Sequence, residues 1–445
     1  MKRIFCFLLL LSVISASMFA QESENTQKEV SKSVNNFEET DGDENSSSIK
    51  YAPRVSDYFV AFGEEALIEL FGKAFVNLRS PRPQGLNFDN IIYSITKQPY
   101  VWDKTSFEQN QLVHPYAGNL YFNAARANNL DFWTAAAYTA WGAWSWENIY
   151  ENSVTSWNDL ITTTAAGVIV GESFHRLSYA AGTIWEPLLW VVSPIDGINR
   201  LLRGERYRYT APQNLEVIYA VEFLTAFSVN EKIASNSNEF MALAEFHPYV
   251  VYQNPFGHKT KEPFDQFTLD AMLLTNLYNT MGYVEIDGAL YSWPFFCNTE
   301  LPSSIGINLN YKVNYFDRLN YSTNAAGIFL RQQIPFNENS ADINYFWWNV
   351  EADFVFLETS KVDNINFYNI GPEAKLEIGL ETERIAVRAS GEFDYVFPQN
   401  VWHNKDFIGV DFKILPWLCV GVEDLLICTE GDIRNFTSVG VKVRK

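Results

Sequence analysis

The hydrophobic positions of this chain follow two different periods, and the change falls near residue 214. Before it, apolar residues recur every three or four positions, as on one face of an α-helix. After it, apolar and polar residues alternate, as on the two faces of a β-strand. In residues 305–315, Ile, Leu, Tyr and Val occupy the odd positions, and Gly, Asn and Lys the even ones. The pattern therefore predicts a helical unit followed by a sheet.

The alternating runs predict a closed antiparallel β-barrel of the transmembrane type. They are about ten or more residues long, with one apolar, aromatic face and one charged or small face, as in tilted membrane strands around a polar lumen. A soluble sandwich would have shorter strands and a less polar inner face. Closing the sheet also removes the unpaired edges that hydrocarbon does not tolerate. We expect twelve strands, with ten as the alternative, at residues 215–228, 239–253, 265–278, 282–296, 304–316, 321–334, 342–358, 373–383, 384–397, 405–415, 417–424 and 435–444.

The N-terminal residues predict export. Lys2 and Arg3 precede an apolar run and then small residues, which is the pattern of a secretory signal peptide over residues 1–20. After it, no apolar run reaches the roughly 20 residues of a membrane-spanning helix, so strands must make any membrane span. Four segments follow from these patterns: a signal peptide at 1–20, a disordered polar tether at 21–50, a helical unit at 51–210 that plugs or abuts the barrel, and the β-barrel at 211–445.

Composition narrows the class of protein further. The formal net charge of −20 argues against a nucleic-acid partner, for which a basic surface is expected, and the aromatic content of 16% suits a membrane protein. After removal of the signal peptide, three cysteines remain, too few for a disulfide scaffold. If Glu423 and Asp424 formed a hairpin turn, Cys419 and Cys428 would face each other at a spacing that a disulfide tolerates. The same residues are equally compatible with a loop.

Start and stop signals divide the helical unit. Asp131 is a good N-cap, and Ser156 followed by Asp159 resembles a capping box. Glycines in the middle of two of these helices predict close helix packing, because glycine is otherwise unfavourable there. We expect helices at 64–78, with Phe71, Phe75 and Leu78 on its apolar side, at 115–129, from Asp131 to about 151, and from Ser156 to 177, with the packing glycines at 142, 167 and 171.

Counting residues along antiparallel helices places isolated ionisable residues in two layers. The first layer, the candidate catalytic set, contains His114, Glu147, Glu151 and Asp159. A histidine beside carboxylates at i and i+4 suits acid–base chemistry. Helix capping, solvation at a helix end and a structural histidine are the alternatives for the same residues.

The second layer lies about 15 Å further along the helices. It contains the candidate binding residues Arg126, Glu172, His175 and Arg176. The spacing of Glu172 and His175 matches the Glu-x-x-His element of carboxylate-bridged metal bundles, but such sites need two elements and further glutamates at one level. We therefore assign no metal ligands and no cofactor, with a metal as the alternative. An ion pair between Glu172 and Arg176 would be purely structural.

The residues of this helical block resemble the family known as domain of unknown function 3943. At Asn129, after Asn128, the family pattern has glycine, but asparagine tolerates the same left-handed conformation. The resemblance implies an exported bacterial protein with a helical segment preceding β structure, and it implies no known activity. The matching motifs are His114-Pro115-Tyr116-Ala117-Gly118, Tyr121-Phe122-Asn123-Ala124-Ala125-Arg126, Trp146-Glu147, Glu151, Asn158-Asp159-Leu160, Gly171-Glu172, Arg176-Leu177-Ser178 and Pro263-Phe264-Asp265.

Together these patterns predict a non-enzymatic protein of a bacterial outer membrane. The barrel would bind or pass a small solute or lipid, with the bilayer as its surroundings, and the polar layers would hold the helices in register. The alternative is an envelope hydrolase acting on lipid or cell-wall material. In that case His114 would be the base, Glu147 its orienting partner and Arg126 an anion contact. The sequence leaves open whether the protein is an enzyme.

Overall fold

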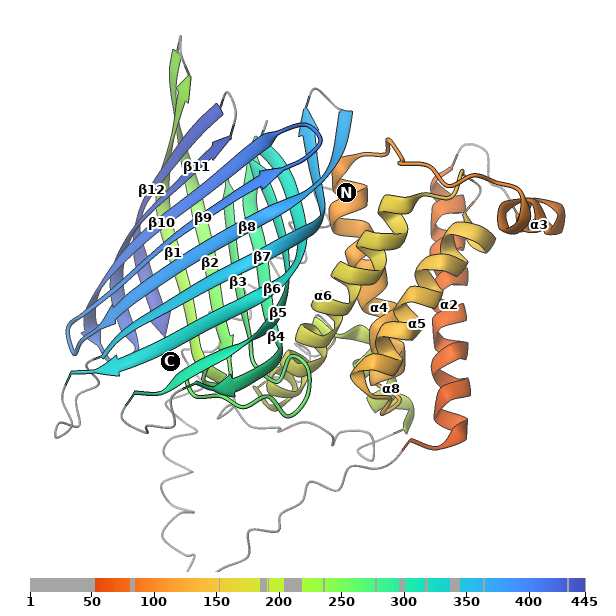
Figure 1. The fold of residues 1–445 in the computed structure, drawn as a ribbon, viewed down its shortest axis with the longest axis horizontal. Coiled ribbons are helices and arrows are strands. Elements are labelled where there is room, and N and C mark those ends of the chain that lie inside the picture. The colour runs from red at the N-terminus through yellow and green to blue at the C-terminus, as the bar shows by residue number, and fades with distance from the viewer. Residues whose placement is uncertain are drawn as a thin grey trace, which may run out of the picture.

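The structure, a computed structural model, has two parts that lie side by side: a twelve-stranded barrel and a group of helices against its wall (Figure 1). The helices come first in the chain, and the barrel occupies the C-terminal half. The structure describes residues 53–80, 85–151, 153–184, 190, 192–203, 218–234, 237–276, 278–295, 301–316, 319–336, 345–362, 365–429 and 432–444. The predicted signal peptide and tether lie outside these residues.

The barrel closes with every strand antiparallel to its neighbours in the chain and with β1 paired to β12. This confirms the predicted closure and strand number. The predicted ranges are mostly a few residues shorter than the strands. The strands are β1 (Ile218–Ala234), β2 (Ser237–Tyr252), β3 (Phe267–Thr275), β4 (Thr280–Pro294), β5 (Ser303–Phe316), β6 (Leu319–Pro335), β7 (Tyr345–Val362), β8 (Ile365–Glu381), β9 (Ile385–Val396), β10 (Val401–Leu415), β11 (Leu418–Thr429) and β12 (Asp432–Arg444).

The two faces of the sheet have opposite polarity. On β5, Ile305 and Ile307 are exposed on the outside, whereas Asn308, Asn310 and Lys312 are buried in the lumen. Cross-strand pairing extends this pattern, since Lys312 pairs with Glu285 on β4 and with Thr323 on β6. An apolar exterior around a polar interior is the arrangement of a membrane-type barrel.

The predicted helices at 115–129 and 131–151 agree closely with the structure, but the first helix begins at Val55, before the predicted start at Glu64, and the helix predicted to end at Leu177 continues to Ile184. The carboxylate of Asp131 accepts hydrogen bonds from the backbone N–H groups of Trp133 and Thr134, which confirms this N-cap. Ser156 Oγ accepts one from the N–H of Asp159, but the N–H of Ser156 donates to Glu147, so only one half of the predicted capping box forms. Asn129 has a φ of 63°, the left-handed conformation expected there. The elements are α2 (Val55–Arg79), α3 (Phe88–Thr96), the π-helix η2 (Gln109–Val113), α4 (His114–Arg126), α5 (Phe132–Ser145), the π-helix η3 (Trp146–Tyr150), α6 (Trp157–Ile184) and α8 (Pro194–Arg203).

Glycine permits the close contact between α4 and α6. A Cβ atom on Gly118 would lie 1.9 Å from the carbonyl oxygen of Thr163 and 2.8 Å from the Cα of Gly167. The other predicted packing glycines are equally constrained, since a Cβ on Gly171 or Gly142 would collide with an aromatic side chain of α4. The predicted tight packing of these helices is therefore confirmed.

The helical unit abuts the outer face of the barrel wall. Helix residues such as Phe122 and Ile169 share one apolar core with Ile286, Tyr311 and Val313, which face outward on β4 and β5. Of the two predicted arrangements, the described helices adopt abutment, not plugging. The physical reason is that the lumen is filled by side chains of the barrel itself, while the wall offers an apolar surface.

Hydrogen bonds fasten the chain before α4 to the same wall. Tyr368 on β8 donates its hydroxyl to the carbonyl of Asp103 at 2.8 Å, and Asn366 donates to the carbonyl of Thr105 at 2.6 Å. Lys361 on β7 lies 3.6 Å from the carboxylate of Glu108. Taken singly, none of the described helices is both long enough and apolar enough to traverse a membrane.

The pairing of Cys419 with Cys428, which the sequence left open, does not form. Glu423 and Asp424 do not form a turn, because they lie in the middle of β11, opposite Gly409 and Ile408 of β10. The two cysteines therefore sit near opposite ends of one strand, about 30 Å apart at about 3.3 Å per residue. Both are free thiols.

Candidate functional site

Between the end with the short β1–β2 connection and the end where β1 begins and β12 stops, the lumen contains an apolar layer, an ionic layer and a pocket. We call the second of these ends the terminal rim, and the pocket lies near it. The apolar and ionic layers overlap in height, since on β10 Phe407 of the apolar layer lies closer to the terminal rim than Lys405 of the ionic layer. Each group uses inward-facing positions of many strands, so barrel closure brings its residues together.

The apolar layer joins inward-facing side chains of β2 to β6 with those of β10 to β12. Within it, Phe316 and Phe436 have ring centroids 5.1 Å apart. Close packing of such side chains excludes water. The layer consists of Leu243, Met272, Leu274, Met281, Tyr283, Phe316, Leu319, Tyr321, Phe407, Leu425, Ile427 and Phe436.

The ionic layer connects strands that are not neighbours in the barrel. Lys312 on β5 contacts Glu373 on β8 at 2.6 Å and Glu392 on β9 at 3.0 Å. Lys405 on β10 contacts Glu285 on β4 at 2.9 Å. Both lysines are buried. Because these pairs cross the lumen, they occupy the space that an open channel would need.

The pocket near the terminal rim has a volume of about 140 Å³ and combines aromatic rings with charges of both signs. Arg388 lies at its centre, with its guanidinium 4.1 Å from the ring centroid of Tyr249. One Nη atom of Arg388 contacts Asp270 at 3.3 Å and Glu377 at 3.1 Å. The charged lining residues are Glu222, His247, Arg331, Glu377, Glu381, Arg388, Asp411, Glu423, Lys442 and Arg444.

Among the residues that the structure describes, three buried polar atoms of the pocket lining have no hydrogen-bond partner. They are Nε of Arg388, Oδ1 of Asp411 and Nε2 of Gln266. Arg388 and Asp411 lie on adjacent strands, since Arg388 pairs with Gly409 and Asp411 follows two residues later. Buried polar groups are usually satisfied, so these atoms mark a place where a bound solute could supply partners of both kinds.

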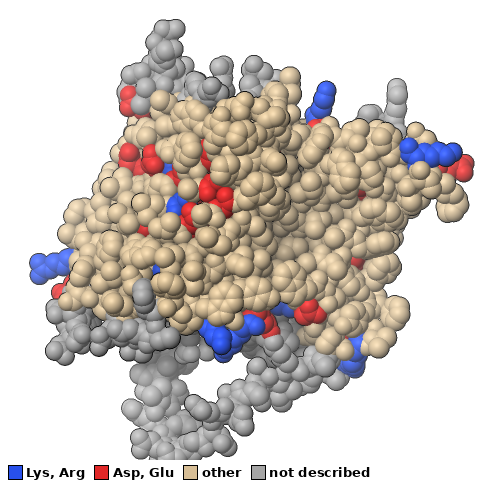
Figure 2. Space-filling view, in the orientation of Figure 1, with Lys and Arg blue, Asp and Glu red and all other residues tan. Residues whose placement is uncertain are grey.

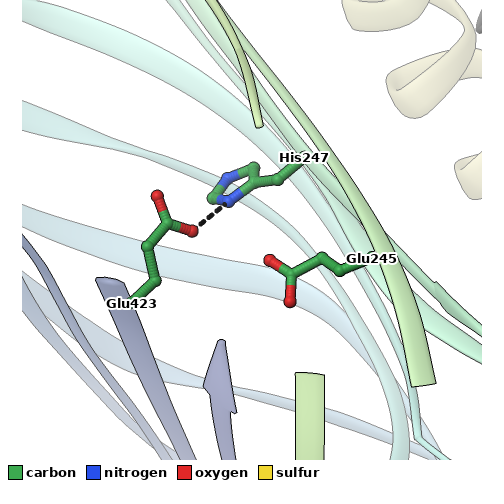
Figure 3. A group of neighbouring side chains, drawn as sticks. All are labelled: Glu245, His247 and Glu423. Carbon is green, nitrogen blue, oxygen red and sulfur yellow. Dashed lines mark hydrogen bonds and ion pairs between the residues drawn. The ribbon is translucent and has the colours of Figure 1, made fainter. Parts of the chain in front are cut away.

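Beside the pocket, His247 on β2 lies among carboxylates (Figure 3). Its Nδ1 is 2.8 Å from Glu423, and its Nε2 is 2.7 Å from Asp270. Glu245 is the third residue of this group with metal-ligand spacing. A ring with a carboxylate at each nitrogen is satisfied as an imidazolium, and Lys442 adds a second positive charge 2.9 Å from Glu423. The contacts therefore fit an ion-pair network better than a metal site.

A second group with ligand spacing, Glu373, Glu392 and Asp394, belongs to the ionic layer. The ammonium of Lys312 already contacts the first two, and His403 Nδ1 lies 2.7 Å from Asp394. The side chains present thus supply the positive charge that these acids need. Both groups were missed from the sequence, although the alternation placed their residues on the polar face, because strand distances across a barrel are not readable from spacing.

The predicted first layer of the helical unit is assembled differently from the expectation. His114 Nδ1 is 3.1 Å from the hydroxyl of Thr163, and its Nε2 is 3.7 Å from Asp159, so Asp159 replaces Glu147 as its acidic partner. Glu147 instead accepts a 2.8 Å hydrogen bond from the backbone N–H of Ser156. It remains close enough to Glu151 and Asp159 to interact electrostatically with both.

The predicted second layer brings three of its four residues together. Glu172, fully buried, accepts hydrogen bonds from Arg126 at 2.8 and 3.1 Å and from Arg176 at 2.8 Å. Arg176 also donates to the carbonyl of Pro263, in the loop between β2 and β3, at 3.1 Å. His175 points elsewhere and lies 3.2 Å from Asp196 of α8. The layer thus joins the helices to the barrel.

A third polar group in the helical unit was missed. Glu65, Glu69 and Lys73 of α2 are buried against the other helices, and Ser145 of α5 donates its hydroxyl to Glu69. Their spacing of four residues in an otherwise apolar segment was the available signal. The level count did not include α2, because its long connection to α4 gives no simple rule for their relative height.

Two sequence comparisons bear on this chain. A family model described as "Domain of unknown function (DUF3943)" matches residues 99–188, which confirms the resemblance predicted from the motifs. The match covers the linker before α4 and the helices through α6. A search of curated proteins gave no significant match.

Comparison with solved structures returned membrane barrels. The NanC porin is 7% identical, with a TM-score of 0.30, over 49% of this chain and 98% of its own. Outer membrane phospholipase A from Escherichia coli is 12% identical, with a TM-score of 0.31, over 49% and 89%. An anion-selective porin from Comamonas acidovorans is 7% identical, with a TM-score of 0.24, over 51% and 98%. The fold assignment rests on the strand pairing described above.

Proposed function

We propose that this protein is an outer-membrane barrel that binds a small zwitterionic solute in the pocket at the terminal rim and does not conduct. The observation that carries the proposal is the set of unpartnered donor and acceptor atoms on Arg388, Gln266 and Asp411 around the cavity. The outer-membrane location is supported by the N-terminal export pattern together with a closed barrel that is apolar outside and polar inside.

Binding is favoured over passage because the ionic layer and the apolar layer together fill the lumen next to the pocket. Ion pairs such as Lys312 with Glu373 cross the lumen, and the side chains of the apolar layer pack beside them. A hydrated ion would have to break buried pairs, whose charges are costly to leave unpaired. In this proposal the pocket opens toward the terminal rim and does not continue through the lumen.

The size and chemistry of the pocket favour a small solute with both charges. A volume of about 140 Å³ is close to that of engineered cavities that hold a benzene-sized molecule, about 150 Å³. A carboxylate on the solute would accept from the free Nε of Arg388, and an ammonium would donate to the free Oδ1 of Asp411. The aromatic rings of Tyr249, Trp347 and Phe407 would contact its apolar part.

Binding is tested with zwitterionic probes on the purified full chain in detergent. Glycine, alanine and proline are added separately, with sodium phosphate and glucose as comparison solutes, and the unfolding temperature is measured. We expect at least one zwitterion to raise it, because a ligand that binds only the folded state stabilises that state. Failure of all three zwitterions to do so would overturn the proposed ligand class.

Two variants and one matched control locate the binding. Arg388→Gln and Asp411→Asn should each abolish the shift, whereas Arg384→Gln, in the exposed turn between β8 and β9, should keep it. Asp411→Asn is included because loss of Arg388 also removes one partner each from Asp270 and Glu377 and can affect folding. A shift that survives in both pocket variants would contradict binding at this place.

Current measurements test the closed lumen. In planar bilayers we expect the full chain to give no steady current proportional to voltage, because the ionic and apolar layers fill the lumen. A steady ohmic current would contradict a closed lumen and would show that the barrel is a pore.

For the polar layers of the helical unit, we propose a structural role. The hydrolase alternative needs an accessible nucleophile beside His114, but the adjacent hydroxyl of Thr163 is buried, and Asp159 is buried as well. His114 with Thr163 and Arg126 with Glu172 join α4 to α6.

A further inference from the structure

The polarity of helix α2 is inverted. Its buried side carries Asp57, Glu65, Glu69 and Lys73. Its outer side is apolar, and Phe71 and Leu78 are 75% and 86% exposed there. A surface helix of a water-soluble protein has the opposite arrangement, with apolar residues buried and charged residues exposed. Phe71 and Leu78 belong to the predicted apolar side of this helix, and the structure places that side outward.

The neighbouring helices share this inversion. In α4 and α5, whose residues the structure describes completely, no charged side chain is fully exposed, and the exposed residues of α5 are Trp133, Ala137, Ala140 and Trp141. Their polar residues, such as Asn119 and Thr139, are buried. The view in Figure 2 shows a nearly uncharged surface over the helices, with charged side chains at its upper and lower edges.

The apolar surface has the height of a bilayer core. From Tyr58 to Leu78 every exposed residue of α2 is uncharged, and these 21 positions span about 30 Å at about 1.5 Å per residue, the thickness of the hydrocarbon region. Arginines flank the stretch at both ends, since Arg54 precedes α2 and Arg79 ends it. Arginine at a helix end can reach the polar interface.

This surface is continuous with the outside of the barrel. The helices cover β4 to β7 from outside, as their contacts with Ile286 and Tyr311 require (Figure 1). Strands that the helices do not cover carry apolar residues on the same outer face, including Leu376 on β8, Phe393 on β9 and Ile408 on β10. Where the helices cover the apolar outer face of the barrel, their own apolar outer surface takes its place.

We infer that the helical unit is immersed in the bilayer beside the barrel, with lipid acyl chains against the outer faces of α2 and α5. Helices α2 and α6 alone carry too much charge to enter hydrocarbon, but in the assembled unit the charged groups face one another and the barrel wall. The buried Glu172 with its two arginine partners is an example. The inference rests on the proposed membrane location of the barrel.

Spin labels on single cysteines test this in the full chain reconstituted in phosphatidylcholine vesicles, with the other cysteines replaced by alanine. Phe71→Cys reports on α2, Leu376→Cys on the exposed outer face of β8, and Arg384→Cys on an exposed turn. Relaxation by oxygen, which concentrates in hydrocarbon, is compared with relaxation by a water-soluble nickel chelate. We expect the labels at 71 and 376 to respond more to oxygen, and the label at 384 more to nickel.

The outcomes separate the two proposals. A label at 71 that responds mainly to nickel would place α2 in water, and one shielded from both reagents would indicate a protein partner. Either result would overturn the inference. If the label at 376 also responded mainly to nickel, the membrane location of the barrel itself would fail. Circular dichroism spectra that match those of the parent chain identify the variants that have folded.

Discussion

At the scale of single residues, Glu172 is notable because two arginines bind its carboxylate. It is fully buried, and both carboxylate oxygens accept hydrogen bonds from arginines, with Arg126 on α4 and Arg176 on its own helix. In the described part of the chain, neither arginine has another carboxylate as close, since the distance from Arg176 to Glu262 is 3.6 Å. Two guanidinium groups therefore depend on one carboxylate.

We predict that Glu172→Gln lowers the free energy of unfolding of the helical unit by about 3–5 kcal/mol, because removing one partner leaves buried charges uncompensated. The measurement is urea unfolding of the purified protein, followed by tryptophan fluorescence. The matched control is Glu383→Gln in the exposed turn after β8, which should change stability by less than about 0.5 kcal/mol. Equal stability of the two variants would show that the arginine pair does not depend on Glu172.

His114 supports a second prediction at this scale. His114→Ala should lower the free energy of unfolding by about 1–3 kcal/mol, because buried Thr163 and Asp159 lose a partner. The abundance of the protein in cells should fall as a result. Quantitative immunoblotting and unfolding measurements check it. Normal abundance and stability combined with a lost phenotype would favour the hydrolase reading instead.

At the scale of elements, the packing of α4 on α6 depends on backbone contact. Gly118 and Gly167 face each other, and no side chain fits between them. Close approach also lets the polar groups of the two helices meet, as His114 and Thr163 do. The polar layers therefore require these glycines. The sequence predicted both features, close packing and polar layers, for the same helices.

We predict that Gly118→Ala destabilises the protein by about 1–3 kcal/mol or more, because the added Cβ would lie 1.9 Å from the Thr163 carbonyl and force the helices apart. The matched control is Gly63→Ala in α2, where nothing lies within 4 Å of the added Cβ. That change should stabilise by up to about 1 kcal/mol, since alanine favours helices. Urea unfolding of both variants tests this prediction. We expect the change in the free energy of unfolding to have opposite signs in the two variants.

At the scale of the whole molecule, closure determines how the barrel behaves. Every strand is paired on both sides, with β1 joined to β12. A sheet without edges has no end from which to unpair, and ion pairs such as Lys405 with Glu285 tie distant strands together.

We therefore predict heat-modifiable migration. On gel electrophoresis in dodecyl sulfate, the unboiled protein should migrate differently from the boiled one, because the closed barrel stays folded without heating. In cells, the protein should require detergent for extraction. Release from membranes by high salt or by carbonate would contradict the membrane location.

Several residue contacts show how far sequence reasoning reached. The predicted caps at Asp131 and Ser156 are local, since a side chain binds a backbone group two or three residues away, and they were found. The level count placed Arg126 beside Glu172 because it needs only short connections and a constant helical rise. It failed for His175, whose partner Asp196 lies on α8, beyond the helices that were counted.

The sequence by itself determined the strands, the polarity of their faces and the two layers within the helical unit, because pleat and helical rise are local properties of the backbone. The tertiary structure alone decided that the helices stand outside the barrel, that Asp159 and not Glu147 meets His114, and that Arg388 and Asp411 line one pocket. The reason is that periodicity shows which residues share a face but not what that face meets. An apolar helix face can contact protein or lipid equally well, and distances across a closed lumen depend on all twelve strands at once.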